Sequence, residues 1–299
     1  MKSQYKISSC PVCGHGHFTP FLHVNDWLVS KEEFKLLQCN HCKFVFTSNA
    51  PAEQHISPYY NSEEYIEHSD TSSGLIYGIY HHARKLMLRY KLKKIRQLNT
   101  GKKLLDIGSG SGYFMNHMHQ NGFEVTGVEI SEKAIALCQQ KFKITAHKPS
   151  EFLAGKLARN YDIITLWHVF EHVYSFNEYM RLFSDSLNDD GYLLLALPNH
   201  ESFDANYYSS YWCAYDTPRH LWHFTPKTLE KHAHNFGFKL VRKHRLPLDP
   251  FFNAMVSASY KKSTTFLPFT LLIGLVSYVK SLSNVNKSSS IIYVLKKDT

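Results

Sequence analysis

Short apolar runs alternate with stretches of helical spacing over the central and C-terminal parts of the chain. An apolar run of about four to eight residues between turn residues is typical of a buried strand, whereas apolar residues three and four apart are typical of a helix. The pattern predicts strands near residues 103–107, 123–128, 142–146, 161–167, 191–197, 238–244 and 291–295. It predicts helices near residues 112–120, 131–141, 176–187 and 226–237. The alternation indicates an α/β fold with a mostly parallel sheet covered on both faces.

A glycine-rich turn follows the first of these strands. Gly108, Gly110 and Gly112 stand at every second position after Asp106, and Glu129 follows the next strand. Glycines let the backbone pass close to a ligand, and the helix N-terminus behind them offers free N–H groups. An acid at the tip of the second strand can accept both hydroxyls of a ribose. The turn therefore predicts a site for an adenosine-type cofactor, and an acid before the loop suits a cationic ligand such as an ammonium or a sulfonium.

A second group of polar residues follows the strand at 161–167, at the sheet edge where ligands of α/β proteins bind. It contains Trp167, His168, Glu171 and His172. Either histidine could take a proton from an acceptor, because imidazole titrates near neutral pH. Glu171 could orient a histidine or bind a divalent metal ion. The alternative is that Glu171 and His172 cap the next helix and brace the loop.

Aromatic side chains crowd residues 199–224, which interrupt the strand and helix pattern. A long aromatic loop at the carboxyl end of a sheet is typical of a substrate cover. His220 and His223 are further candidates for a catalytic base, and Arg219 is a candidate for binding an acidic group of the substrate. The alternative for Arg219 is an internal salt bridge with Asp216.

Four blocks of the sequence, taken together, resemble the class I S-adenosylmethionine (SAM) methyltransferases. They are LLDIGSGSGYF, VEIS, YDIITLWHVFEHV and GYLLLALPN. The resemblance implies a Rossmann-like, seven-stranded α/β sheet with SAM as the cofactor. It also implies that the three glycines shape the cofactor loop, Asp106 anchors the amino-acid end, Glu129 holds the ribose and Trp167 faces the reactive end. Glu151 and Phe152, after the third strand, are candidates for the edge of the adenine.

Two shorter patterns bear on the methyl acceptor. The pattern H-V-x-E-H resembles small-molecule methyltransferases of quinone, sugar and secondary-metabolite pathways. The pattern D-x-P-R-H-L-x-H-F-T resembles a block in bacterial methyltransferases of polysaccharide pathways. The resemblance to the methyltransferases covers residues 102–241 and implies a small molecule, a sugar or a lipid-linked glycan as the acceptor.

Four cysteines near the N-terminus have the spacing C-x2-C-x25-C-x2-C. They are Cys10, Cys13, Cys39 and Cys42. Each pair can direct two sulfurs at one ion, and four thiolates complete the tetrahedral shell of a structural zinc ion. Residues 1–50 are therefore expected to form a zinc-ribbon-like segment in which the metal supplies much of the folding energy. Such segments resemble the zinc ribbons found ahead of several methyltransferase domains.

The segment between the cysteines and the sheet is divided into two parts. Residues 51–74 are aromatic and rich in turn residues, and are expected to form a linker or a lid over the cofactor. There, Tyr59 and Tyr60 could line a substrate pocket or pack the ribbon onto the main domain. Residues 75–98 have helical periodicity with many basic side chains, which could track RNA phosphates or simply face solvent. Both parts lie in the predicted segment 51–100, a lid or linker followed by a basic helix.

The last two predicted strands are separated by an insertion at 247–289. The SAM-binding domain is expected at 101–246, and its final strand at 290–299. Residues 266–279 of the insertion are apolar but too few for a membrane span of about 20 residues. They could lie in a membrane interface, form a homodimer contact or pack as a core helix.

Charge and the N-terminal sequence narrow the setting of the protein. The 299 residues have a net charge of +9 and a pI near 9.1, which permits binding to RNA, anionic lipid or a phosphorylated substrate. No apolar signal segment stands in MKSQYKISS, which predicts a cytoplasmic protein, with peripheral contact at the inner face of the membrane as an alternative. The leading prediction is a SAM-dependent methyltransferase that modifies an oxygen atom. The alternatives are a methyltransferase of ribosomal or transfer RNA, a non-catalytic SAM-binding module and a nicotinamide dehydrogenase.

Overall fold

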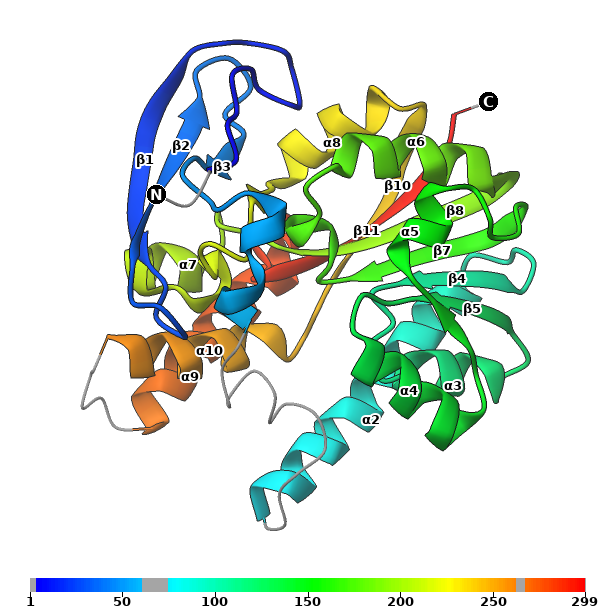
Figure 1. Cartoon of the computed structure of the whole chain (residues 1–299). Helices are drawn as coiled ribbons and strands as arrows, with labels where there is room; N and C mark the ends of the chain where they lie inside the picture. The colour runs from blue at the N-terminus through cyan, green and yellow to red at the C-terminus, as the bar shows by residue number, and fades with distance from the viewer. Residues whose placement is uncertain (1–3, 61–74, 262–266, 299) are drawn as a thin grey trace.

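A seven-stranded sheet forms the centre of the molecule (Figure 1). The computed structural model describes residues 4–60, 75–261 and 267–298. In spatial order the strands are β10 (Phe238–Arg245), β11 (Ser290–Lys297), β8 (Leu187–Pro198), β7 (Tyr161–Trp167), β4 (Lys103–Ile107), β5 (Glu124–Val128) and β6 (Ala146–His147). The strands from β8 to β6 are parallel, and β11 lies antiparallel between β8 and β10. This order confirms the predicted Rossmann-like α/β sheet.

One strand differs from its prediction. The apolar run at 142–146 was expected to be a strand, but α4 (Glu132–Phe142) continues to its start. The helix ends with Lys143 in the left-handed region, at φ +59°. Only Ala146 and His147 then pair with β5.

Helices cover both faces of the sheet, as predicted (Figure 1). Because side chains alternate along a strand, Leu105 and Ile164 pack on one face with α6 (Phe176–Ser186) and α8 (Pro226–His234). Their neighbours Leu104 and Ile163 pack on the other face with α2 (Leu75–Arg96) and α3 (Tyr113–His119). Burial on both faces explains the continuous apolar runs of these strands. Shorter helices are α5 (Pro149–Leu153) and α7 (Phe203–Tyr208).

The cysteine-bearing segment forms a second, antiparallel sheet. Its spatial order is β1 (Phe18–Asn25), β2 (Glu33–Cys39), β3 (Val45–Thr47) and β9 (Trp222–His223). The fourth strand comes from the aromatic loop that the sequence predicts as a substrate cover. Cys10 and Phe44 belong to the same buried cluster as Leu195 of the central sheet. The N-terminal segment is therefore built into the main core, and the segment boundaries proposed from the sequence stay a prediction.

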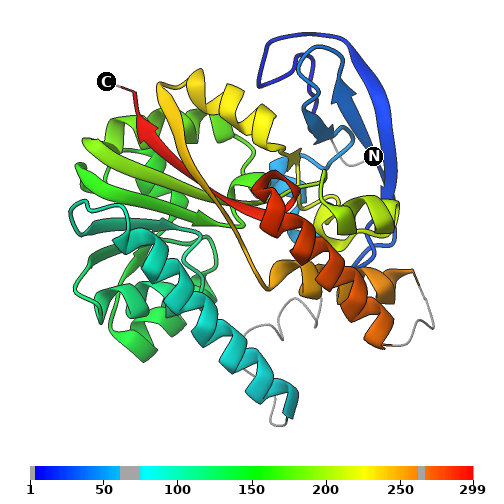
Figure 2. The same cartoon turned by 180° about the vertical axis from the view of Figure 1, so that it is seen from behind.

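Two helices form the insertion between β10 and β11. They are α9 (Asp249–Tyr260) and α10 (Leu267–Ser283), and Figure 2 shows α10 on the outside of the molecule. Among the described helices, none combines the length and the apolar character that a membrane crossing needs. Residues 61–74 of the predicted lid and Phe266 of the apolar segment lie outside the described residues.

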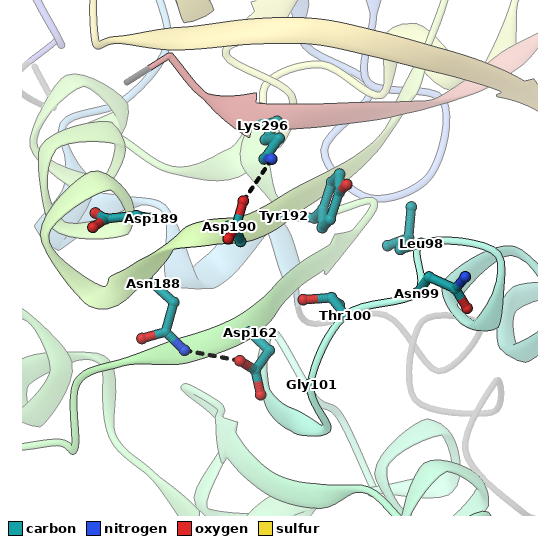
Figure 3. Close-up of a pocket in the computed structure, with 10 residues that line it drawn as sticks. All are labelled: Leu98, Asn99, Thr100, Gly101, Asp162, Asn188, Asp189, Asp190, Tyr192 and Lys296. Carbon is teal, nitrogen blue, oxygen red and sulfur yellow. Dashed lines mark hydrogen bonds and ion pairs between the residues drawn. The ribbon is translucent and has the colours of Figure 1, made fainter.

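An open hollow of about 520 Å³ lies at the end of the central sheet where the parallel strands begin (Figure 3). Its lining includes Gly101, just before β4, and Asp162, the second residue of β7. These residues mark the amino ends of the parallel strands. Ligands of such sheets bind at the carboxyl ends, so the hollow is not the expected site.

Candidate functional site

The turn between β4 and α3 carries three glycines with positive φ. The φ values of Gly108, Gly110 and Gly112 are +73°, +53° and +83°. A Cβ at Gly108 would lie 2.2 Å from Cγ2 of Val169, so the loop is packed tightly against the segment after β7. A Cβ at Gly110 would meet nothing within 4 Å. The backbone at Gly110 therefore borders open space, where a ligand can approach it.

Glu129 closes this loop from the end of β5. Its Oε2 accepts the N–H of Gly110 at 2.8 Å, and its Oε1 accepts the N–H of Ser131 at 2.9 Å. Each carboxylate oxygen has two acceptor positions, so each keeps one for a further donor such as a ribose hydroxyl. The acid that the sequence assigns to the ribose thus lies directly against the open glycine.

Asp106 of β4 and Lys91 of α2 are an acid and a base that interact electrostatically. Oδ1 of Asp106 accepts the hydroxyl of Thr165 at 2.7 Å. Burial raises the pKa of Asp106 to about 7, although Thr165 and Lys91 act in the opposite direction. The ammonium of Lys91 lies 4.1 Å from the centre of the Trp167 ring. Burial lowers the pKa of Lys91 to about 8, while Asp106 and Asp249 act to raise it. One acid and one cation match the two charged ends of an amino acid.

His168 bridges two carboxylates just after β7. Its backbone φ is +58°, a conformation uncommon outside glycine. Its Nδ1 lies 3.5 Å from Oε1 of Glu171, and its Nε2 lies 3.2 Å from Oδ2 of Asp249. Burial acts to lower the pKa of His168, but the two carboxylates outweigh it and raise the pKa to about 9. At neutral pH the ring therefore holds its proton, so in this arrangement it is a hydrogen-bond donor rather than a base.

Glu171, His172 and His220 converge beside His168. One potential ligand atom from each of the three lies within 4.8 Å of the others. The two histidine rings are perpendicular, with centres 4.5 Å apart. The hydroxyl of Tyr60 lies 3.1 Å from Nδ1 of His172. The structure thus brings together four of the five predicted catalytic residues and one predicted substrate residue.

Arg219 is engaged inside the protein instead of facing a substrate. It is 1 % exposed and forms ion pairs with Asp26, at 2.9 Å, and with Asp216. Its Nη1 donates to the backbone oxygen of Tyr59 at 2.7 Å. The side chain of Tyr59 is also buried, and its hydroxyl donates to Oε2 of Glu32 at 2.6 Å. These contacts join the N-terminal sheet to the aromatic loop. They match the alternatives given from the sequence, an internal salt bridge for Arg219 and packing of the N-terminal segment onto the main domain for Tyr59.

Three further candidates have structural contacts. Nε2 of His223 lies 3.1 Å from the hydroxyl of Thr47 on the neighbouring strand, and burial holds the pKa of His223 well below its usual value. Glu151 accepts the N–H of Lys148 at 2.9 Å and so caps its own short helix. Phe152 is 3 % exposed and packs against aromatic rings of α6, the position of a core residue.

Lys91 and Asp249 are site residues that sequence reasoning missed. Lys91 was grouped with the solvated or RNA-facing side of its helix. A signal was present, because Lys91 lies three residues after Leu88 and four before Ile95, and therefore interrupts the apolar stripe at helical spacing. Asp249 carried no such signal, because only the tertiary structure brings the start of α9 to the end of β7.

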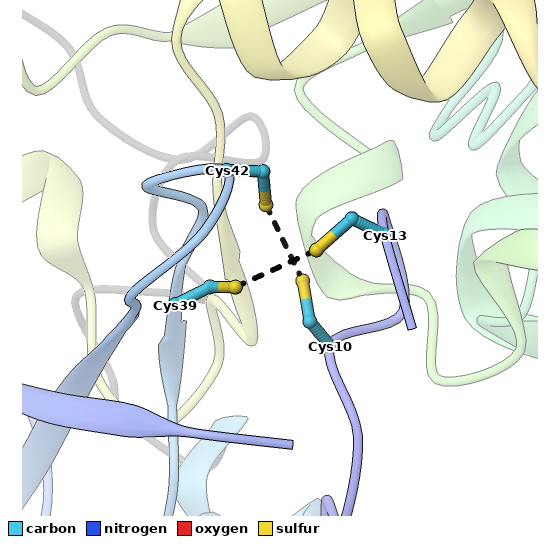
Figure 4. Close-up of side chains that lie close together, drawn as sticks. All are labelled: Cys10, Cys13, Cys39 and Cys42. Atoms are coloured by element: carbon cyan, nitrogen blue, oxygen red, sulfur yellow. Dashed lines mark hydrogen bonds between the residues drawn. The ribbon is translucent and has the colours of Figure 1, made fainter. Parts of the chain in front are cut away.

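The four N-terminal cysteines converge from two separate turns (Figure 4). The Sγ atoms of Cys10 and Cys42 lie 3.5 Å apart, as do those of Cys13 and Cys39. All four sulfurs lie within 4.8 Å of one another. Sulfurs bound tetrahedrally to one zinc ion at about 2.3 Å are about 3.8 Å apart. The four thiols thus have the donor type and the spacing of a closed zinc shell.

Comparison with known proteins agrees with this geometry. A family model described as a methyltransferase domain matches residues 80–243, more than half of the chain. The ubiquinone biosynthesis O-methyltransferase of Bordetella avium is 30% identical over 105 residues, which are 33% of this chain and 44% of that protein. The protein of the same name from Aromatoleum aromaticum is 37% identical over 80 residues, 25% of this chain and 34% of that protein. The matched region thus spans less than half the length of these curated relatives.

One solved structure shares the fold over most of the chain. It is the magnesium protoporphyrin IX methyltransferase from Synechocystis PCC 6803 with bound SAH, the demethylated form of SAM. The TM-score is 0.52 at 13% identity, and the superposition covers 82% of this chain and 100% of that one. At this identity, the likeness shows the fold alone.

Proposed function

The chain belongs to the methyltransferase domain family, and from this premise we propose that it transfers a methyl group from SAM to an oxygen atom of a small molecule. The observation that carries the proposal is the position of Glu129 against the open Gly110, at the sheet edge where His168 and Glu171 also lie. The relatives named as ubiquinone biosynthesis O-methyltransferases support an oxygen acceptor.

The residues at the glycine loop fit SAM. The open backbone at Gly110 admits the ligand, and Glu129 accepts hydrogen bonds from the two ribose hydroxyls. Asp106 holds the ammonium of the amino-acid end, and Lys91 holds its carboxylate. When bound, SAM supplies an electrophilic methyl group on a sulfonium, and the acceptor oxygen attacks it in line. Methyl transfer then depends mainly on alignment of the two molecules and on removal of the acceptor proton.

The cluster at the end of β7 is assigned to the acceptor. His168 holds its proton at neutral pH, because its two ring nitrogens face the carboxylates of Glu171 and Asp249. His220 donates from Nδ1 to the backbone oxygen of Ala214 at 2.9 Å, and its Nε2 faces Glu171 at 4.0 Å and Asp216 at 3.9 Å. His172 is kept neutral because burial and the adjacent His220 lower its pKa to about 4. We assign acceptor deprotonation to this cluster.

Calorimetry with SAH tests the donor site. Glu129→Ala removes two hydrogen bonds to a charged group, each worth about 1.5–3 kcal/mol, so the affinity for SAH should fall about 100-fold or more. Glu124→Ala is the matched control, because Glu124 is an exposed acid at the other end of the same strand. Equal SAH affinity in wild type and Glu129→Ala would contradict the assigned donor site.

Methyl-labelled SAM tests the acceptor class. The purified protein is incubated with a lysate of its source, and the products are separated into small-molecule, lipid-glycan, protein and RNA pools. Label in the small-molecule or lipid-glycan pool supports the proposed function. RNase-sensitive label would instead favour the RNA alternative. SAH binding without label in any pool would favour the non-catalytic alternative.

We propose that the four cysteines hold a structural zinc ion. The donor set leaves no position open for a substrate, and the sulfurs have the spacing that a tetrahedral zinc shell needs. The ion would lock the two cysteine turns on which the four-stranded sheet is built. Through β9, this sheet also positions the loop that carries His220.

We further propose that α10 docks on an anionic lipid surface, which favours a lipid-linked acceptor. The helix has its apolar and polar sides reversed relative to a helix that faces water. Its buried positions are Thr270, Ile273, Gly274, Ser277 and Ser281. Its exposed apolar side chains are Leu267, Phe269, Leu271, Leu272, Leu275, Val279 and Leu282. These are seven of the thirteen large apolar side chains that are exposed in the described chain, so the exposure is concentrated on one element.

The inward side of α10 explains this orientation. The hydroxyl of Ser277 donates to Oδ1 of the buried Asp204 at 2.5 Å. A Cβ on Gly274 would lie 2.9 Å from Cα of Phe251, so the small residue lets α9 and α10 pack closely. Lys280 of α10 and Lys287, four residues after the helix, are exposed and match the charge of an anionic bilayer. The helix therefore has the features of an interfacial helix.

Vesicle binding tests this surface. The probe is a vesicle of phosphatidylcholine and phosphatidylglycerol in equal parts, measured by co-sedimentation. Burial of one leucine is worth about 1.5–3 kcal/mol, so Leu275→Glu should weaken vesicle binding at least tenfold. The same substitution at Leu86, an exposed leucine of α2, is the control. A dimer that Leu275→Glu dissociates, without vesicle binding by the wild type, would assign the surface to a second copy instead.

A further inference from the structure

Glu171 is a buried carboxylate without a hydrogen bond. It is 1 % exposed, and within the described chain neither of its oxygens has a hydrogen-bond donor. The nearest cationic groups are His168, at 3.5 Å, and Nε2 of His220, at 4.0 Å. Buried polar groups are normally paired, because an unpaired one costs free energy. Within the described residues Glu171 caps no helix, and its oxygens lack a donor that these residues supply.

Two histidine nitrogens face the same space. Nδ1 of His172 is engaged by the Tyr60 hydroxyl at 3.1 Å, and Nδ1 of His220 donates to the backbone oxygen of Ala214 at 2.9 Å. Within the described chain, Nε2 of each ring is left without a hydrogen bond, and Nε2 of His220 lies 3.9 Å from Oδ2 of Asp216. This arrangement is typical of histidine metal ligands, whose other nitrogen is held by a hydroxyl, carbonyl or carboxylate that fixes the tautomer. One nitrogen of each ring and one oxygen of Glu171 lie within 4.8 Å of one another.

We propose that Glu171, His172 and His220 bind a divalent transition-metal ion. Two imidazoles and one carboxylate suit zinc, manganese or ferrous iron. Ligand atoms bound to one ion at about 2.1 Å lie about 3–4 Å apart, so small side-chain rotations close the site. The surrounding charges favour a cation, because the ion pairs of the described residues join four carboxylates to two positive groups. The carboxylates belong to Asp26, Glu171, Asp216 and Asp249, and the positive groups to His168 and Arg219.

The ion would have open positions for the methyl acceptor. Three protein ligands leave at least one position of a tetrahedral or octahedral ion free. An acceptor hydroxyl bound there has a lowered pKa and loses its proton to solvent more readily. Its oxygen then forms the new bond to the methyl carbon as the carbon–sulfur bond breaks, and the electron pair of that bond stays on sulfur. This role rests on the proposed methyl transfer, whereas the binding of the ion does not.

Manganese binding tests the site without interference from the cysteines. Mn²⁺ prefers oxygen and nitrogen ligands to thiolates, so it reports on this cluster rather than on the four-cysteine site. Protein that keeps its cysteine-bound zinc is dialysed against metal-free buffer without chelator and titrated with Mn²⁺, and free Mn²⁺ is counted by electron paramagnetic resonance. One Mn²⁺ should bind per chain, and pulsed spectra should show the nitrogen couplings of two histidines. These spectra need no variant, so they test the ligands even if a substitution disturbs folding.

A matched pair of variants completes the test. Glu171→Gln keeps the shape of the side chain but removes its charge, and should weaken Mn²⁺ binding at least tenfold. Glu178→Gln changes an exposed glutamate seven residues later and should bind as the wild type does. The proposal is overturned if the wild type binds no Mn²⁺, if no nitrogen coupling appears or if Glu171→Gln binds equally well. SAH binding is measured separately without metal, so a failure of the proposed function remains distinguishable.

Discussion

His232 of α8 is a histidine that the fold must keep uncharged. It is fully buried, and its ring lies between aromatic rings, the nearest being Phe176 at 4.7 Å and Phe236 at 5.0 Å between ring centres. Within the described chain neither ring nitrogen has a hydrogen-bond partner. Burial therefore lowers the pKa of His232 to about 3. We expect this one residue to make the stability of the protein depend on pH.

The direction and size of the effect follow from the two pKa values. The unfolded chain binds a proton at His232 as the pH falls through 6.5, whereas the folded chain does so only near pH 3. The stabilisation is therefore complete above pH 6.5 and is lost as the pH falls toward 3. At pH 5, about 1.5 pH units below the unfolded value, the loss is about 2 kcal/mol. His232→Phe keeps the aromatic contacts and removes this titration.

Urea unfolding at pH 8 and pH 5 measures the effect. Between these two conditions the wild type should lose about 2 kcal/mol more free energy of unfolding than His232→Phe. Any change in packing affects the variant equally at both pH values and cancels in this difference. His234→Phe, on the exposed side of the same helix, should behave as the wild type. Equal losses in the wild type and His232→Phe would refute the reasoning, because they would mean that the buried ring accepts a proton in the folded state.

Two further predictions concern the metal and the cofactor. Cys39→Ser removes one of the four thiolates, so the purified variant should lose its zinc, as measured by elemental analysis. Its N-terminal sheet should also become sensitive to protease. Cys213→Ser should keep the zinc and the protease resistance, because Cys213 lies outside the four-cysteine cluster. Lys91→Met keeps the apolar stem against Trp167 but removes the cation, and should weaken SAH binding about tenfold. Lys93→Met, on the exposed side of the same helix, should leave the affinity for SAH unchanged. Unchanged SAH affinity in Lys91→Met would contradict the role assigned to Lys91.

The sequence by itself determined the central sheet, the cofactor loop and the cysteine cluster. These features depend on local patterns. Continuous apolar runs identify strands buried on both faces, as at 103–107 and 161–167, and both matched the structure. The glycine spacing and Glu129 belong to one strand–turn–helix–strand unit, in which residues about twenty apart in sequence are brought together by local geometry.

Only the tertiary structure decided which polar residues share a site. Arg219 and His220 are adjacent in sequence, yet Arg219 is paired with Asp26 of the N-terminal sheet whereas His220 faces Glu171. Asp249 reaches His168 because the insertion packs against the end of β7. Such outcomes depend on contacts between residues far apart in the chain. Local pattern specifies which element a residue belongs to. The packing of elements specifies whether its charge is paired inside the protein or remains available to a ligand.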